Sequence, residues 1–149
     1  MAAGPRPPHD AALRFCECLN RFEVDYVIVG SEAVAFHGVP RYSLDFDVFV
    51  RATRANLFRT KAALETFGVT DLAAQIDPEL WARTRATLRL GEPPVQIDVL
   101  LQISGAEFEQ VQRSAVAGRY GDVAVRFISR ADLIANKRAA GREKDLADV

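Results

Sequence analysis

The stretch Leu44-Asp-Phe-Asp-Val-Phe-Val50 decides the fold, because acidic residues alternate with apolar ones along it. In a β-strand, successive side chains face opposite sides. The four apolar residues at every second position from Leu44 to Val50 therefore share one face, which must be the core. Asp45 and Asp47 share the other face, with their backbones about 7 Å apart. The pattern predicts a strand over 44–50 that is buried on one side and acidic on the other.

Two neighbouring carboxylates on one strand require an explanation. They repel each other unless a cation lies between them, and Asp is among the residues least suited to strands. A hard ion such as Mg²⁺ removes the repulsion, since it is held by one or two carboxylates together with waters and substrate phosphates. The alternative interpretation is an edge strand with a solvated acidic face, and this strand alone does not decide between the two.

A third carboxylate, Asp98, interrupts a second alternating segment, Val95-Gln-Ile-Asp-Val-Leu-Leu101. The apolar residues at alternate positions again define a core face, and Asp98 lies on the other face. If this strand lies beside 44–50, the three carboxylates converge on one exposed face of the sheet. Two-metal phosphoryl transfer requires such a cluster, and one carboxylate can also accept the proton of an attacking hydroxyl.

A turn between a strand and a helix precedes the acidic strand by about fifteen residues. A β-branched strand is expected over 26–29, a short helix over 31–36, and Gly30-Ser31 joins them. Glycine lets the backbone approach a phosphate closely, and a helix start offers free N–H groups. A Gly-Ser turn is common by itself, but its spacing from the acidic pair is more specific.

The rest of the chain predicts an α+β domain with a small mixed sheet flanked by helices. Residues 1–9 are expected to form a flexible tail and residues 10–149 a single domain. Further helices are expected over 10–22, 53–67, 129–140 and 142–149, a hairpin over 85–90 and 95–103, and a strand over 123–127.

Capping residues set the expected helix ends. Asp10, Thr53 and Ser129 are predicted N-caps, since their side-chain oxygens can accept a hydrogen bond from a free N–H group. Gly68 is predicted to end the helix over 53–67, and Gly141 to break the last helix in two.

Composition limits the function classes. The 149 residues are 49% hydrophobic and 26% charged, with a formal net charge of -1, which excludes overall disorder and argues against a broadly basic nucleic-acid-coating protein. No apolar run approaches the ~20 residues that span a bilayer, and the N-terminus does not resemble a secretory signal. Cys16 and Cys18 are too close together to bridge easily. We therefore expect a soluble, cytoplasmic protein that does not bind a membrane.

The signature residues resemble those of a known superfamily. Gly30-Ser31, His37-Gly38, Arg41, Ser43 and Asp45-x-Asp47 are similar to the motif of the polymerase-β-like nucleotidyltransferases. Within that superfamily the chain most resembles the AbiEii-type toxins and related small bacterial nucleotidyltransferases. The segment Ser129-Arg-Ala-Asp-Leu-Ile-Ala-Asn-Lys137 is similar to their closing segment.

The resemblance implies roles for these residues. Asp45, Asp47 and Asp98 would be catalytic carboxylates that bind Mg²⁺, or Mn²⁺ in its place. Gly30 and Ser31 would hold the β- and γ-phosphates of a nucleoside triphosphate such as ATP, and Lys137 would neutralise their charge. Arg41 and Ser43 would contact the nucleotide or support Asp45.

The expected reaction is transfer of a nucleotidyl group to a hydroxyl of RNA or protein, by a toxin paired with a cognate antitoxin. The first rival is a catalytically silent domain of the same fold that binds a partner protein. The second is a metal-dependent phosphodiesterase, which would need neither Lys137 nor the Gly-Ser turn.

Some polar and aromatic residues allow two interpretations. His37 precedes a glycine and is expected to have a local structural role rather than a chemical one. Trp81 and the series Arg83, Arg85 and Arg89 could present a basic strand to an RNA acceptor. The simpler interpretation is a solvated hairpin anchored by one tryptophan.

Overall fold

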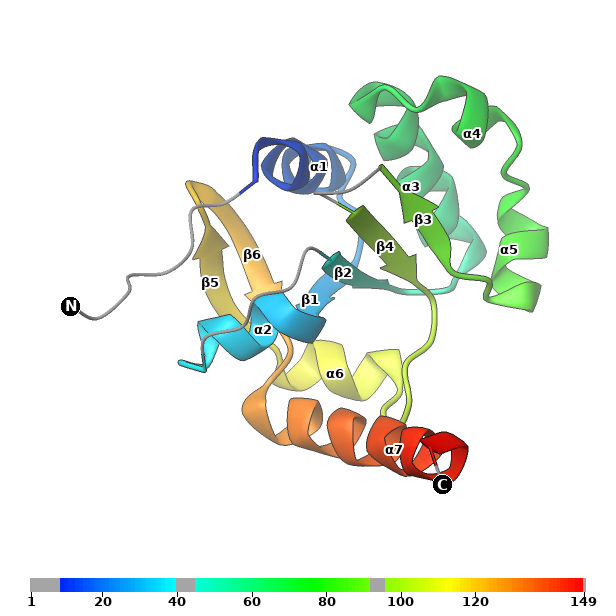
Figure 1. Ribbon diagram of the computed structural model, residues 1–149. Coiled ribbons are helices and arrows are strands. Elements are labelled where there is room, and N and C mark those ends of the chain that lie inside the picture. Colours follow the sequence, from blue (N-terminus) through cyan, green and yellow to red (C-terminus); the bar gives the residue numbers. More distant parts are fainter. Residues whose placement is uncertain (1–8, 40–44, 92–95, 149) are drawn as a thin grey trace.

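A computed structural model describes residues 9–39, 45–91 and 96–148 of the chain, and their side chains as far as residue 141. Within these residues one mixed sheet has the strand order β3-β4-β2-β1-β6-β5 (Figure 1). Its strands are β1 (Tyr26–Val29), β2 (Asp45–Val50), β3 (Leu88–Leu90), β4 (Gln96–Leu100), β5 (Val116–Tyr120) and β6 (Val123–Phe127). The α+β class with a mixed sheet is confirmed.

Strand directions explain how distant segments meet. The central strand β1 is antiparallel to β2 and parallel to β6, whereas β2 is parallel to β4. Parallel neighbours need a long crossover connection. Between β2 and β4 the chain forms three helices and the edge strand β3, which then pairs antiparallel with β4.

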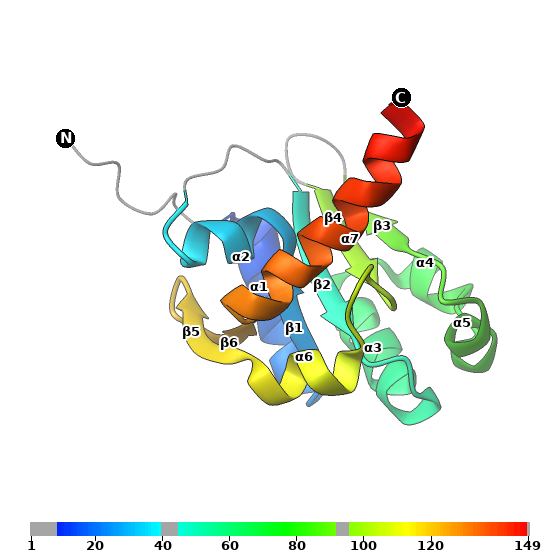
Figure 2. The same cartoon turned by 90° about the horizontal axis from the view of Figure 1, so that it is seen from below.

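Helices cover both faces of the sheet. They are α1 (Asp10–Arg21), α2 (Gly30–Phe36), α3 (Arg54–Phe67), α4 (Thr70–Ala74), α5 (Pro78–Thr84), α6 (Phe108–Ser114) and α7 (Arg130–Asp148). Figures 1 and 2 show α1 and α3 on one face, and α2, α6 and α7 on the other. On the first face Phe15 of α1 packs edge-on against Phe67 of α3, with ring centroids 5.2 Å apart. The sheet is thus the middle of three layers.

Most central elements match the sequence prediction. The strands expected over 26–29 and 123–127 have those bounds, and the strand over 44–50 is described from Asp45 onward. Leu44, like residues 1–8 of the expected tail, lies outside the described residues. The predicted hairpin is confirmed, although β3 and β4 are shorter than expected. Cys16 and Cys18 are free thiols.

Two of the three predicted N-caps are confirmed. The Thr53 side chain accepts a hydrogen bond from the Asn56 N–H, and that of Ser129 accepts one from the Asp132 N–H. Gly68 ends α3 in the left-handed conformation, as expected. The prediction for Asp10 is wrong because the N-cap is His9, which has no side-chain cap bond. Asp10 lies instead in the first turn, where a carboxylate is stabilised by the helix dipole.

The predicted break at Gly141 is wrong. Helix α7 continues through Gly141 to Asp148. A glycine inside a helix costs only about 1 kcal/mol relative to alanine, which neighbouring good helix formers can offset. The segments expected as two helices over 129–140 and 142–149 are therefore one helix.

Four short elements were not predicted: α4, α5, α6 and β5. The three helices have only five to seven residues, too few for a clear hydrophobic period. Strand β5 is an edge strand with little burial before Tyr120, so it lacks alternation. One signal was available, because the Asp77 side chain caps α5 and Pro78 follows it.

Within the described residues, every helix is too short or too polar to span a lipid bilayer.

Candidate functional site

The acidic residues of β2 and β4 lie side by side. In the parallel ladder Asp47 is the direct partner of Asp98, and Asp45 is the partner of Gln96. Direct partners in a sheet project to the same face, so Asp47 and Asp98 are neighbours and Asp45 lies two residues nearer the start of β2. The role predicted for Asp98 required β4 to lie beside β2, and the two strands are indeed neighbours.

This face of the sheet is less exposed than the sequence indicated. Asp98 retains only 7% of its accessible surface, while Asp45 and Asp47 are half-buried. Phe49 lies two residues beyond Asp47 on the same face and packs edge-on against Phe108 of α6, at 5.1 Å between ring centroids. The expectation of a fully exposed acidic face is wrong, because helices also cover this side.

The glycine turn directly contacts the acidic pair. Val29, the last residue of β1, pairs with Asp47, and Gly30 begins α2 at once with a φ of 68°. A Cβ atom on Gly30 would overlap the Oδ2 atom of Asp47 and lie 3.1 Å from its Cγ atom. Residue 30 must therefore be glycine for two reasons, its backbone conformation and the carboxylate beside it.

Burial, together with the like charges around it, raises the pKa of Asp47 from 3.8 to about 7. Burial is the largest cause, followed by the charges of Asp98 and Asp45 and a hydrogen bond with Asp98, while Arg89 opposes the shift. Burial and the neighbouring carboxylates therefore favour the protonated form of Asp47.

Arg89 of β3 provides the positive charge in this cluster. It is the direct cross-strand partner of Asp98. Its Nε donates to Oδ1 at 3.0 Å and a terminal nitrogen donates to Oδ2 at 3.4 Å. The hydrogen bond and charge of Asp98 raise the pKa of Arg89. The sequence analysis grouped Arg89 with other arginines of the predicted hairpin. Its pairing with Asp98 could not be predicted, because it depends on the register of the two strands.

The donor chemistry of this cluster fits a hard divalent cation. Asp47 and Asp98 offer carboxylate oxygens from adjacent strands, and Asp45, at the start of β2, offers another carboxylate. As the side chains lie, both oxygens of Asp98 face Arg89. Among the described residues, no three acidic, histidine or cysteine side chains form a group that could hold a metal ion. A cation bound at Asp98 would have to share that carboxylate with Arg89 or replace Arg89 there.

Other predicted nucleotide-binding residues are less closely placed. Ser31 follows Gly30 in α2 and is half-buried. Lys137 is exposed on α7, one turn beyond the buried Leu133, and α7 lies on the same side of the sheet as α2 (Figure 2). Arg41 and Ser43 lie outside the described residues.

His37 has the structural role that the sequence indicated. Its Nε2 atom is 2.8 Å from the carbonyl oxygen of Ile128, just after β6. The preceding Phe36 stacks on Phe127, with ring centroids 4.0 Å apart. Together these contacts fix the end of α2 to the end of β6.

Trp81 lies in α5, and its side chain bonds to the segment 85–90 that was predicted as the first arm of the hairpin. It is buried in α5, and its indole nitrogen donates to the carbonyl oxygen of Ala86 at 2.8 Å. Arg83 lies in the same helix and Arg85 caps it, so the three arginines do not form one basic strand.

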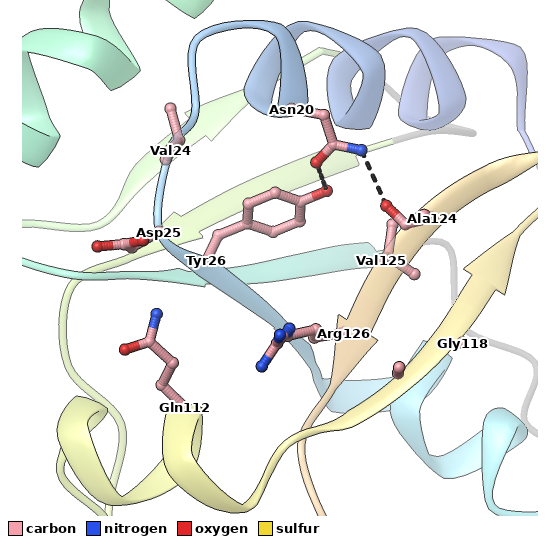
Figure 3. Close-up of a pocket in the computed structure, with 10 residues that line it drawn as sticks. Asn20, Val24, Asp25, Tyr26, Gln112, Gly118, Ala124, Val125 and Arg126 are labelled. Carbon is pink, nitrogen blue, oxygen red and sulfur yellow. Dashed lines mark hydrogen bonds between the residues drawn. The ribbon is translucent and has the colours of Figure 1, made fainter.

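A hollow of about 410 Å³ lies at the opposite end of β1, away from the acidic cluster. Figure 3 shows Arg126 of β6 and Gln112 of α6 pointing toward it. The Tyr26 hydroxyl donates to the Asn20 side chain at 2.7 Å along its wall. Of the predicted site residues that the structure describes, none lines this hollow.

The fold and the cluster define an α+β domain with a buried acidic pair beside a glycine turn. No family model matches the chain, and no curated protein is significantly similar to it.

Proposed function

We propose that the chain is a Mg²⁺-dependent nucleotidyltransferase of the polymerase-β-like type. The observation that carries the proposal is the direct pairing of Asp47 with Asp98, with Gly30 packed against the Asp47 carboxylate. Two adjacent carboxylates beside a glycine turn, of which Asp98 is buried and Asp47 half-buried, are costly for stability unless a cation and a phosphate group use them. The sequence resemblance supports the same class.

In this proposal each residue has a defined task. Asp45, Asp47 and Asp98 would hold Mg²⁺ or Mn²⁺, which lowers the charge on the phosphates when bound. Asp98 would also accept the proton of the attacking hydroxyl. Gly30 and Ser31 would bind the terminal phosphates, and Lys137 would neutralise them.

The acceptor would be a hydroxyl of RNA or of a protein side chain. Such an activity suits a cytoplasmic toxin held inactive by a cognate antitoxin. This assignment rests on the resemblance, and the acidic cluster itself does not distinguish between the acceptors.

One observation favours a second candidate, a silent domain of this fold that binds a partner protein. Arg89 already neutralises Asp98, so the cluster can persist without a metal ion. A silent domain would keep this ion pair permanently.

The test is incubation with each α-labelled nucleoside triphosphate and Mg²⁺, with total RNA or cell lysate added. Label on a macromolecule, absent with the Asp47→Asn variant, is expected. Nucleotide binding without label transfer would favour the silent domain, and absence of both binding and transfer would contradict the proposal.

A further inference from the structure

We propose that Arg89 acts as an internal counter-ion that competes with the divalent cation for Asp98 and must leave that carboxylate before the metal site forms. This inference rests on the proposed function, because it concerns the same acidic cluster. It adds a residue that regulates when the cluster can bind metal.

The geometry of the ion pair supports direct competition. Arg89 donates to both oxygens of Asp98, at 3.0 and 3.4 Å. A divalent cation held between Asp47 and Asp98 would need at least one of those oxygens. It would also bring two positive charges next to the guanidinium group, and like charges at such distances repel strongly.

Burial indicates which partner moves. The side chain of Asp98 is 9% exposed, whereas that of Arg89 is 64% exposed. Arg89 lies on β3, a three-residue strand at the edge of the sheet. Asp98 lies in β4, with strands on both sides. The carboxylate is therefore fixed, and the long arginine side chain can turn into solvent.

The ion pair also explains how the cluster persists without metal. Asp47 and Asp98 are adjacent carboxylates with Asp45 close by, and the Arg89 charge acts on all three. An arginine in this position reduces their mutual repulsion and holds Asp98 in place. When a cation binds, it replaces the Arg89 guanidinium at Asp98, so the negative charge of that carboxylate is compensated both before and after binding.

Metal affinity in the absence of nucleotide gives a direct test. Mn²⁺ binding would be measured by titration calorimetry and by the electron paramagnetic resonance signal of free Mn²⁺. Arg89→Gln is expected to bind Mn²⁺ about three- to tenfold more tightly than the wild type, because an ion pair of modest strength no longer competes. Arg126→Gln is the matched control, since Arg126 is an exposed arginine on β6, and it should leave the affinity unchanged.

Three further measurements guard against indirect effects. Arg89→Lys keeps the charge without the planar fork and should give an intermediate affinity. In the Asp98→Asn background, Arg89→Gln should have no further effect on Mn²⁺ binding. Adding Mg²⁺ to the wild type should shift the ¹⁵Nε resonance of Arg89, identified by its absence in Arg89→Gln, and leave that of Arg126 in place.

The outcomes separate this inference from the proposed function. If Arg89→Gln bound Mn²⁺ equally or more weakly than the wild type, the proposed competition would be wrong, but the proposed metal site would not be contradicted. An unchanged Arg89 resonance on metal binding would do the same. Failure of Mn²⁺ to bind both the wild type and the variant would overturn the metal site and the competition together.

Discussion

The two ends of the β1–β2 ladder are both rich in polar groups, but the groups are paired differently at each end. At one end, Asp25 pairs with Arg51 at 3.0 Å, and Arg51 also bonds Glu109 and Gln112 of α6. At the other end, Asp45, Asp47 and Asp98 lie close together, and the charge of Arg89 acts on all three. At the first end, acidic side chains are paired with an arginine. At the second end, three carboxylates are grouped together.

Asn56 completes the contrast. Its side chain is fully buried, yet it accepts from the Asp25 N–H and donates to the carbonyl oxygens of Asp25 and Arg51. Hydrogen-bonded buried groups add stability, whereas crowded carboxylates subtract from it. The comparison indicates that one end stabilises the fold, whereas the carboxylates at the other end lower its stability, as expected of the proposed metal site.

The largest expected effect is on catalysis at the acidic end. Asp98→Asn should reduce transfer about a hundred- to ten-thousand-fold, because the proton acceptor is lost, while nucleotide affinity stays nearly the same. Transfer rate and affinity would be measured on one preparation, with Asp122→Asn as the control because Asp122 is an exposed acid remote from the cluster. Full activity in Asp98→Asn would remove Asp98 from the site.

The next effect is on stability at the opposite end. Asn56→Ala should lower the free energy of unfolding by about 3 kcal/mol, because four side-chain hydrogen bonds are lost in a buried position. Urea unfolding would measure it. Asn136→Ala, which loses one bond from a half-buried side chain to the Ser104 carbonyl oxygen, should cost about 1 kcal/mol or less. Equal losses would contradict a special stabilising role for Asn56.

A smaller effect concerns the glycine turn. Gly30→Ala should destabilise the fold by about 2 kcal/mol, because its φ is 68° and the new Cβ would overlap the Asp47 carboxylate. Gly141→Ala is the matched control. Among the described residues, no atom outside the adjoining backbone of α7 lies within 4 Å of a Cβ at Gly141, so this variant should gain up to about 1 kcal/mol. If thermal unfolding shows Gly30→Ala to be neutral, the close packing of the turn is wrong.

The smallest expected effect is a pH dependence. The pKa of Asp47 is raised to about 7 in the fold, so the folded state holds its proton more tightly than the unfolded state does. Stability should therefore fall as pH rises from about 4 to 7 and then level off, by about 1–2 kcal/mol after allowing for solvent screening.

Asp47→Asn should remove most of this slope, whereas Asp71→Asn, at an exposed position in α4, should keep it. Urea unfolding at several pH values would show the difference. A slope that is unchanged in Asp47→Asn would assign the pH dependence to another group.

Sequence patterns predicted the centre of the fold better than its edges. The β-branched run at Tyr26–Val29 and the capped helix ending at Gly68 carry strong local signals, and both are observed. Strand β5 carries no alternation because it lies at an edge, and α7 shows that one glycine does not end a long helix. Local signals therefore succeed where burial or capping is strong.

The candidate site was predictable only in part. Alternation identified the face that Asp45, Asp47 and Asp98 share, because that property is local. Neither the pairing of Asp47 with Asp98 nor the burial of Asp98 could be predicted, since both depend on strand register and on helices from other parts of the chain. The Arg89 ion pair was missed for the same reason.

The parallel pairing of β2 with β4 also bears on the order of folding. In the folded protein, the chain between Asp47 and Asp98 forms α3, α4, α5 and β3. Long-range contacts of this kind form slowly, because a large loop must close first. We expect partly folded chains to lack the acidic cluster, so a divalent ion would bind only a chain whose sheet is complete and could not nucleate its folding.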